Sequence, residues 1–261
     1  MADEPEQTKL DLLGELETLA ADEFVERAVA QLPARSLLLN FVSTVDGLAA
    51  VDGRSGPIGG PADRAVFHAL RGFVDAVMVG AGTARREHYG PLVRDERVRA
   101  TRERRGLAAR PLAIIVSRSL ELPVDLPLLA DPHSEVVVVT NGERTLDPVA
   151  ARVSYIRTGG ADVDLGAALS RLRDDYGAET ILCEGGPTLA GTLMSIDAVE
   201  ELWLTIGPRA AGTAIGPRIL QGPELGTPRE LELRSAGRCG DELFLRYGVA
   251  SAERISRMTT D

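Results

Sequence analysis

The sequence predicts an α/β protein built on one mixed, mostly parallel sheet, with helices on both faces. From Ser36 onward, short apolar runs alternate with helical patterns, which is typical of a sheet covered by helices. Two of these runs end in glycine-rich turns that lead into helices, as in the crossover units of parallel sheets. In the last third the runs follow one another without helices between them. We therefore expect antiparallel strands near the C-terminus.

Each element follows from its own pattern. The helix beginning near residue 164 has Asp162 and Asp164 as alternative N-caps. The arginine-rich stretch 94–110 has no clear apolar period, and we expect it to be mobile or a short helical excursion. The apolar runs predict strands at 36–44, 74–79, 111–117, 135–140, 153–157, 180–183, 200–207, 229–235 and 242–248. Helical spacing predicts helices at 61–72, 82–87, 164–176 and 187–195.

The N-terminal part of the chain differs from the rest. Residues 1–31 hold nine acidic residues against Lys9 and Arg27, within a net charge of −10. Leucines at helical spacing in this part predict an acidic helical extension over residues 1–33 that packs against the main body. We expect a main domain over 34–250 and a tail over 251–261.

Composition excludes several classes of function. No basic face is visible, so we expect no nucleic-acid partner. No apolar run reaches about 18 residues and no secretory leader is present, so we expect no membrane partner and a cytoplasmic location. Cys183 and Cys239 cannot form a disulfide framework, and the three histidines are scattered, so we expect no metal. The single lysine, Lys9, excludes a phosphate-binding loop of the GxxxxGK type.

Two strand–glycine–helix turns are the strongest chemical signals. In the first, an apolar strand runs into Gly80-Ala81-Gly82-Thr83, and a helix begins. In the second, Thr180–Cys183 ends in Glu184-Gly185-Gly186-Pro187-Thr188-Leu189. Glycine lets a ligand approach the backbone closely, and a helix N-terminus attracts phosphate. Either turn alone is compatible with a structural role. The pair predicts a nucleotide with a pyrophosphate, bound by Gly80, Gly82, Thr83, Gly185, Gly186, Pro187, Thr188 and Leu189.

A third turn indicates which nucleotide binds. The run Leu112–Val116 ends in Ser117-Arg118. A hydroxyl and a cation suit the 2′-phosphate of NADP, whereas an NAD site usually offers an acid. We therefore predict NADP as the cofactor, with Ser117 and Arg118 among its ligands.

Three carboxylates are candidates for the catalytic acid or for orienting the substrate. Asp46 lies in a tight Asp-Gly turn, and Asp63 lies in the first turn of the helix at 61–72. Glu184 follows a strand at the edge where ligands of α/β folds bind. Two of them also have a structural explanation. Asp63 would complement the helix dipole, and Glu184 would be a solvated carboxylate at the end of a strand.

These motifs, in order and spacing, resemble the riboflavin-biosynthesis pyrimidine reductases. The resemblance covers roughly residues 36–248 and rests on Ser43–Gly47, Ser55–Gly60, Ala69–Arg71, Val79–Thr83 and Glu184–Gly191. It implies a dihydrofolate-reductase-like fold, a homodimer, and hydride transfer from NADPH. The implied substrate is a ribosylaminopyrimidine phosphate of the phosphoribosylamino-uracil type, whose ribose is opened and reduced to a ribityl chain.

The resemblance also implies roles for individual residues. Val42, Thr83, Glu87, Ser117 and the segment 186–192 would contact NADP. Ser55, Arg71, Leu92, Arg94 and Glu184 would line the substrate, with Arg71 and Arg94 as partners of its phosphate.

One departure from the family pattern keeps other functions open. Many members of the family carry a basic residue where this chain has Leu48, so a cationic anchor for the substrate is lost. The alternatives are reduction of dihydrofolate or another pteridine on the same fold, and a non-catalytic protein that only binds NADP(H).

Overall fold

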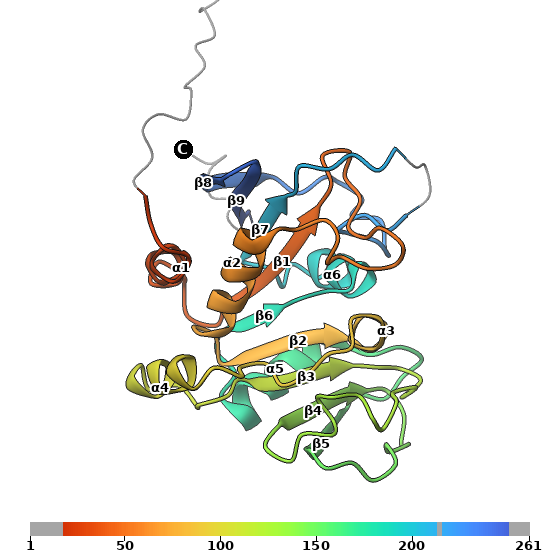
Figure 1. The fold of residues 1–261 in the computed structure, drawn as a ribbon. Coiled ribbons are helices and arrows are strands. Elements are labelled where there is room, and N and C mark those ends of the chain that lie inside the picture. The colour runs from red at the N-terminus through yellow and green to blue at the C-terminus, as the bar shows by residue number, and fades with distance from the viewer. Residues whose placement is uncertain (1–17, 213–215, 251–261) are drawn as a thin grey trace, which may run out of the picture.

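Nine strands form one sheet in the computed structural model, which describes residues 18–212 and 216–250 (Figure 1). The strands are β1 (Leu37–Ser43), β2 (Ala76–Gly80), β3 (Leu112–Val116), β4 (Glu135–Thr140), β5 (Arg152–Arg157), β6 (Ile181–Cys183), β7 (Glu201–Ile206), β8 (Leu231–Cys239) and β9 (Glu242–Val249). The helices are α1 (Ala21–Val29), α2 (Pro61–Arg71), α3 (Ala81–Arg86), α4 (Glu96–Arg104), α5 (Leu165–Tyr176) and α6 (Pro187–Ser195). The segment 1–17 of the predicted extension and the predicted tail 251–261 lie outside the described residues.

The strand order is β5-β4-β3-β2-β6-β1-β7-β9-β8. All pairs from β5 to β7 are parallel, whereas β9 runs antiparallel to both β7 and β8. The chain builds the sheet outward from β2 to β5 and then returns, so that β6 lies between β2 and β1. The predicted mixed, mostly parallel sheet with antiparallel C-terminal strands is confirmed.

The sheet separates two apolar cores because neighbouring side chains on each strand point to opposite faces. On β1, Leu38 belongs to the core beneath α1, α2 and α3, whereas Leu37 and Leu39 belong to the core beneath α5 and α6. All three leucines are fully buried. Helices therefore cover both faces, as predicted. Cys183 is buried in the second core, and burial raises the pKa of its thiol to about 12, which fits the expected role of a small apolar residue.

The stretch 94–110 contains a helix of nine residues, α4, so the short helical excursion is confirmed as the correct one of our two alternatives. Asp95 caps the helix, since its side chain accepts a hydrogen bond from the N–H of Arg97. Arg102 is fully buried and donates from Nη1 to the carbonyls of Arg71 and Val74, at 2.6 and 2.8 Å. Burial lowers its pKa to about 10. Helix α4 has no regular apolar face, and hydrogen bonds from Arg102 to distant carbonyls attach it to the rest of the protein.

One strand boundary differs from the prediction, whereas Asp164, one of the two predicted N-caps of α5, is confirmed. Strand β8 continues to Cys239, beyond the predicted end at residue 235, because it pairs with β9 along its whole length in a hairpin. Its exposed residues lack the apolar alternation that sequence reasoning follows. At the start of α5, Asp164 is the N-cap and accepts from the N–H of Ala167 at 2.9 Å.

A buried ion pair fastens α1 to the sheet. Arg246 on β9 binds Glu201 on β7 through two hydrogen bonds of 2.7 and 2.8 Å. Its guanidinium also donates to the carbonyl of Ala28 at the end of α1, at 3.2 Å. Beside this pair, Phe24 of α1 packs edge-on against Trp203 with 5.6 Å between ring centroids. Helix α1 therefore shares a core with the sheet, and the domain boundary at residue 33 stays a prediction.

Breaking this ion pair should destabilise the whole chain. We expect Arg246→Ala to lower the free energy of unfolding by about 3–5 kcal/mol, because Glu201 is left buried and unpaired. The matched control is Arg152→Ala, since Arg152 pairs with Glu135 at an exposed site, where about 0–1 kcal/mol is expected. Urea unfolding measures both, and equal small losses would contradict the assignment.

Candidate active site

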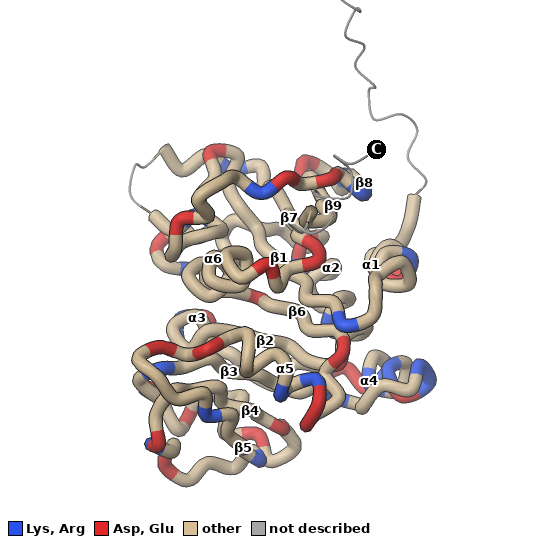
Figure 2. Tube along the Cα trace, turned by 180° about the vertical axis from the view of Figure 1, so that it is seen from behind, with Lys and Arg blue, Asp and Glu red and all other residues tan. Residues whose placement is uncertain are grey.

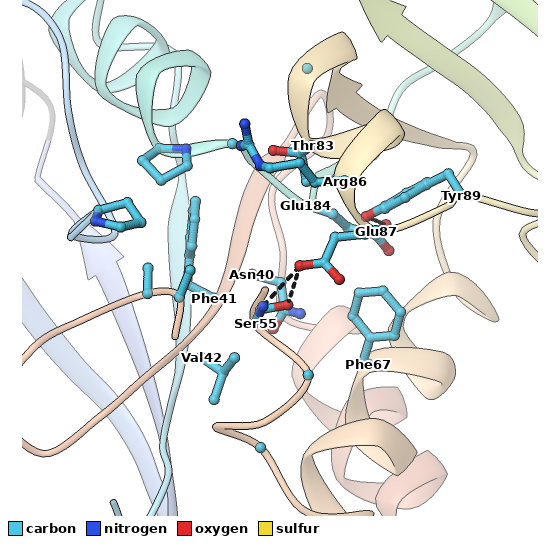
Figure 3. Close-up of a pocket in the computed structure, with 18 of the residues that line it drawn as sticks. Asn40, Phe41, Val42, Ser55, Phe67, Thr83, Arg86, Glu87, Tyr89 and Glu184 are labelled. Carbon is cyan, nitrogen blue, oxygen red and sulfur yellow. Dashed lines mark hydrogen bonds between the residues drawn. The ribbon is translucent and has the colours of Figure 1, made fainter. Parts of the chain in front are cut away.

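A cavity of about 1000 Å³ lies at the carboxyl ends of the parallel strands (Figure 3). Asn40, Phe41 and Val42 of β1, Gly80 of β2 and Glu184 after β6 line it. Strand β6 lies between β2 and β1, so the cavity lies where the strand order reverses, the usual ligand site of open α/β sheets. Its volume is at the upper end of the range for small-molecule sites, about 300–1,000 Å³. The cavity is therefore large enough for a small-molecule ligand.

The two glycine turns meet in one wall of this cavity. The N–H of Gly80 donates to the carbonyl of Gly185 at 2.7 Å. A Cβ atom on Gly186 would lie 2.5 Å from Thr83 Oγ1, so a larger residue would separate the turns. Gly80 and Gly186 are the N-caps of α3 and α6, and neither N-cap makes a side-chain capping hydrogen bond. Backbone N–H groups at such helix starts are available to an anion.

A buried ion pair closes the cavity beneath the second turn. Arg71 Nε and Nη2 donate to Oε1 and Oε2 of Glu184, each at 2.7 Å. The Tyr89 hydroxyl also donates to Oε2 at 2.7 Å, and Arg71 Nη1 donates to the Leu92 carbonyl at 3.2 Å. The Glu184 side chain is 1% exposed. All of its oxygens and all three guanidinium nitrogens of Arg71 therefore have protein partners.

The electrostatics of this group keep the ion pair charged. Burial would lower the pKa of Arg71, but the charge of Glu184 and its hydrogen bonds raise it above its usual range. Burial raises the pKa of Tyr89 well above its ordinary value of 10.0, and the Glu184 charge adds to this. Tyr89 therefore stays a hydrogen-bond donor at neutral pH, and Glu184 is held as an anchored carboxylate.

Helix α2 presents a row of side chains to the cavity. Asp63, Phe67 and Arg71 recur at a spacing of four, so they share one face of the helix. Burial raises the pKa of Asp63, the Thr205 hydroxyl bond lowers it, and the charge of Glu242 raises it further. His68 lies beside them, and its pKa is lowered first by burial and then by the charge of Arg71; the charge of Glu184 raises it, and Arg94 and Arg64 lower it by smaller amounts. This end of the cavity therefore holds charges of both signs.

Two loops complete the walls. Glu87 Oε1 accepts from the N–H and the hydroxyl of Ser55 at 2.8 and 3.1 Å (Figure 3), which ties the loop before α2 to the end of α3. Asp46 lies outside the lining and accepts from the N–H groups of Ala211 and Gly212. The Thr44 hydroxyl, followed by these two N–H groups, lowers the pKa of Asp46 to about 2. Its observed contacts hold two loops together.

The structure brings most of the predicted residues into one place. Those that line the cavity are Val42, Ser55, Asp63, Arg71, Gly80, Gly82, Thr83, Glu87, Glu184, Gly186, Pro187, Thr188 and Leu189. Outside the lining lie Asp46, Leu92, Arg94, Ser117, Arg118 and Gly185. The roles assigned to these residues stay predictions.

The predicted residues outside the lining differ in their surroundings. Arg94 packs against Gly90, which lines the cavity, and so lies at its rim. Ser117 is buried and its hydroxyl accepts from the N–H of Leu120. Arg118 is exposed and forms an ion pair with Asp162 at 2.8 Å. The pair Ser117-Arg118 is thus engaged in local contacts in this structure.

Sequence reasoning missed several lining residues. The sequence contains a signal for Phe67, because its spacing of four from Asp63 and Arg71 places it on the same helix face. His68 is the next residue on this helix. Tyr89 and the loop residues Pro217 and Gln221 carried none, since only the folded chain brings them to the cavity. Leu48 is 4% exposed and lies outside the lining, next to Ala49, which lines the cavity.

The geometry defines a ligand-binding α/β protein, and comparison with known proteins gives its family. Residues 35–245 match the RibD C-terminal domain, so the chain belongs to this family. The resemblance predicted from the motifs is confirmed. Residues 18–212 and 216–250 contain no helix that is long and apolar enough to cross a membrane, and no cluster of three or more metal-binding side chains.

Three proteins named as pyrimidine reductases or as similar to them match most of this chain. The 2,5-diamino-6-ribosylamino-4(3H)-pyrimidinone 5′-phosphate reductase of Methanothermobacter thermautotrophicus is 28% identical over 219 residues, covering 82% of this chain and 97% of the relative. The enzyme of the same name from Archaeoglobus fulgidus is 26% identical, covering 71% and 86%. The crystal structure of a pyrimidine reductase-like protein from Corynebacterium diphtheriae superposes with a TM-score of 0.75 at 25% identity, covering 89% of this chain and 100% of that one.

The Arg71–Glu184 pair gives a stability prediction. We expect Glu184→Gln to cost about 3–5 kcal/mol of unfolding free energy, because the buried Arg71 charge loses its counter-charge. In a separate cycle, the double variant Arg71→Met with Glu184→Leu should cost less unfolding free energy than the single variants Arg71→Met and Glu184→Leu added together. Chemical denaturation measures this cycle, and strict additivity would show that the two side chains are not coupled.

Proposed function

We propose that this chain is an NADPH-dependent reductase of a ribosylaminopyrimidine 5′-phosphate and belongs to riboflavin biosynthesis. The observation that carries the proposal is one cavity with two different walls. Paired glycine turns form one wall, and α2 with its carboxylate and the nearby arginines forms the other. The family and the relatives named as pyrimidine reductases support this substrate class.

The glycine wall fits a dinucleotide. Gly80, Gly82, Thr83 and the Gly186–Leu189 segment would hold its phosphates, and Val42 would contact it from β1. The fit rests on the close contact of Gly186 with Thr83, which a side chain at position 186 would prevent. When bound, NADPH supplies a hydride. The protein's contribution is to hold the reacting groups together in the cavity between its two walls.

The α2 wall fits an aminopyrimidine. A 2-amino-4-oxopyrimidine presents two adjacent N–H groups, and an ionised carboxylate accepts both. Asp63 is the cavity carboxylate for this role, because Glu184 already has its partners. The guanidinium groups of Arg64 and Arg94, which lie near His68, suit the substrate phosphate. Asp63 therefore favours a 2-amino ring over a 2-oxo ring, whose carbonyl would face the carboxylate.

The direct test is an assay of NADPH oxidation with the two pyrimidine substrates, which differ by the amino or oxo group at ring position 2. We expect turnover with both and a higher kcat/KM for the amino form. Tight NADPH binding without turnover of any pyrimidine or dihydropterin would instead support a non-catalytic NADP(H)-binding protein and overturn this proposal.

Asp63 gives a sharper prediction. Asp63→Asn should lower kcat/KM for the amino substrate by roughly 10- to 100-fold, the loss of a charged hydrogen bond of about 1.5–3 kcal/mol. The exposed Asp125→Asn is the matched control. In the unsubstituted protein kcat/KM should fall as the pH drops through the pKa of Asp63, which lies above 3.8, since protonation removes an acceptor. An unchanged pH profile in Asp63→Asn would contradict this role.

Dihydropterin reduction is the second candidate, and the same observation favours it. A pterin carries the same 2-amino-4-oxo edge that Asp63 fits. Dihydrofolate assayed beside the ribosylaminopyrimidine phosphate ranks the two substrates by kcat/KM. The homodimer and the cytoplasmic location that we expected from the sequence remain proposals.

A further inference from the structure

Arg86 on α3 lines the cavity, and its side chain points toward the glycine wall (Figure 3). Its Nη1 lies 3.5 Å from the place that a Cβ on Gly82 would take. Gly82 and Thr83 belong to the first glycine turn, and Thr83 touches Gly186 of the second. The guanidinium therefore lies close to the point where the two turns meet.

Among the described residues, the two other arginines that line the cavity, Arg71 and Arg64, are engaged. Arg71 is bound to Glu184 and to the Leu92 carbonyl, and Arg64 donates to the Gly59 carbonyl at 3.3 Å. Arg118, predicted from the sequence as the cationic ligand, is paired with Asp162 away from the cavity. By contrast, the side chain of Arg86 makes no hydrogen bond or ion pair with any residue in the described ranges 18–212 and 216–250.

We propose that Arg86 is a cofactor-binding residue whose guanidinium donates to the diphosphate of the dinucleotide. This inference rests on the proposed function. A diphosphate carries two negative charges and is the part of the cofactor that both glycine turns are placed to hold. A planar guanidinium binds two phosphate oxygens at once. The 2′-phosphate is the less suitable partner, because its predicted ligand Ser117 lies outside the cavity lining.

The neighbouring arginine provides a matched control. Arg85 lies on the same helix and carries the same charge, but it donates to the Glu121 carbonyl and does not line the cavity. Both side chains lie in the last turn of α3. The variants Arg85→Gln and Arg86→Gln therefore change net charge and helix electrostatics alike, and only Arg86→Gln removes a cation from the cavity.

The test is a fluorescence titration of both variants with NADPH and, separately, with NADH, which lacks the 2′-phosphate. We expect Arg86→Gln to raise the Kd of both nucleotides by a similar factor of roughly 10- to 100-fold, as for a lost hydrogen bond between charged groups. Arg85→Gln should change either Kd by no more than about twofold, the size of a screened surface effect. Arg86→Lys should restore part of the affinity, since a point charge replaces a fork.

Three outcomes would overturn the inference while leaving the proposed function intact. One is a loss confined to NADPH, which would place Arg86 on the 2′-phosphate. Another is unchanged nucleotide affinity with a raised KM for the pyrimidine, which would place it on the substrate. The third is an equal effect of Arg85→Gln. If the unsubstituted protein binds neither nucleotide, the proposed function itself fails.

Discussion

The buried pair between Arg71 and Glu184 is the interaction on which the rest of the cavity depends. It joins the end of α2 to the residue that follows β6, and Tyr89 and the Leu92 carbonyl bring the segment after α3 to the same point. Two buried charges are stable only when their remaining hydrogen-bonding groups are also satisfied. Arg102 supports the arrangement from behind, because it binds the Arg71 carbonyl and so holds the end of α2.

This pair also divides the chemical roles within the cavity. Glu184 was a candidate acid on sequence grounds, but two guanidinium nitrogens and a phenol hydroxyl hold it as an ionised anchor. Asp63 forms no bidentate pair of this kind: burial raises its pKa, while its hydrogen bond with Thr205 and the charge of Arg64 lower it. In the proposed function, this carboxylate binds the amino edge of the ring. The same logic separates the arginines, since Arg71 serves the structure while Arg86 keeps its donors available.

Glycine gives the opposite wall its shape at the carboxyl ends of β2 and β6, where α3 and α6 lie side by side (Figure 1 and Figure 2). The first turn follows β2 and the second follows β6, and these strands are neighbours in the sheet. Their hydrogen bond from Gly80 to Gly185 and the contact of Gly186 with Thr83 leave no space for a Cβ at position 186. Close backbone approach is what a phosphate-binding wall requires. The two turns therefore act as one site, although they are far apart along the chain.

By itself, the sequence determined the alternation of strands and helices, the two glycine turns and the family. These are local properties: apolar periodicity, a glycine after a strand, and short motifs each need only neighbouring residues. It also indicated part of the cavity lining, from Val42 to Leu189. The second half of β8 was missed, because it lacks apolar alternation and its strand structure comes from pairing with β9. The burial of Arg102 could not be predicted either, because the carbonyls that it binds belong to Arg71 and Val74, far away along the chain.

Only the tertiary structure decided which charged groups are available to a ligand. Asp46, Arg118 and Glu184 look in the sequence like Asp63 and Arg86, since a side chain's type does not reveal its partner. In the fold, Asp46 binds the N–H groups of Ala211 and Gly212, Arg118 binds Asp162, and Glu184 binds Arg71. Asp63 and Arg86 remain in the cavity. The partner of a charged side chain cannot be read from the local sequence, because hydrogen bonds and ion pairs join residues that meet only after folding.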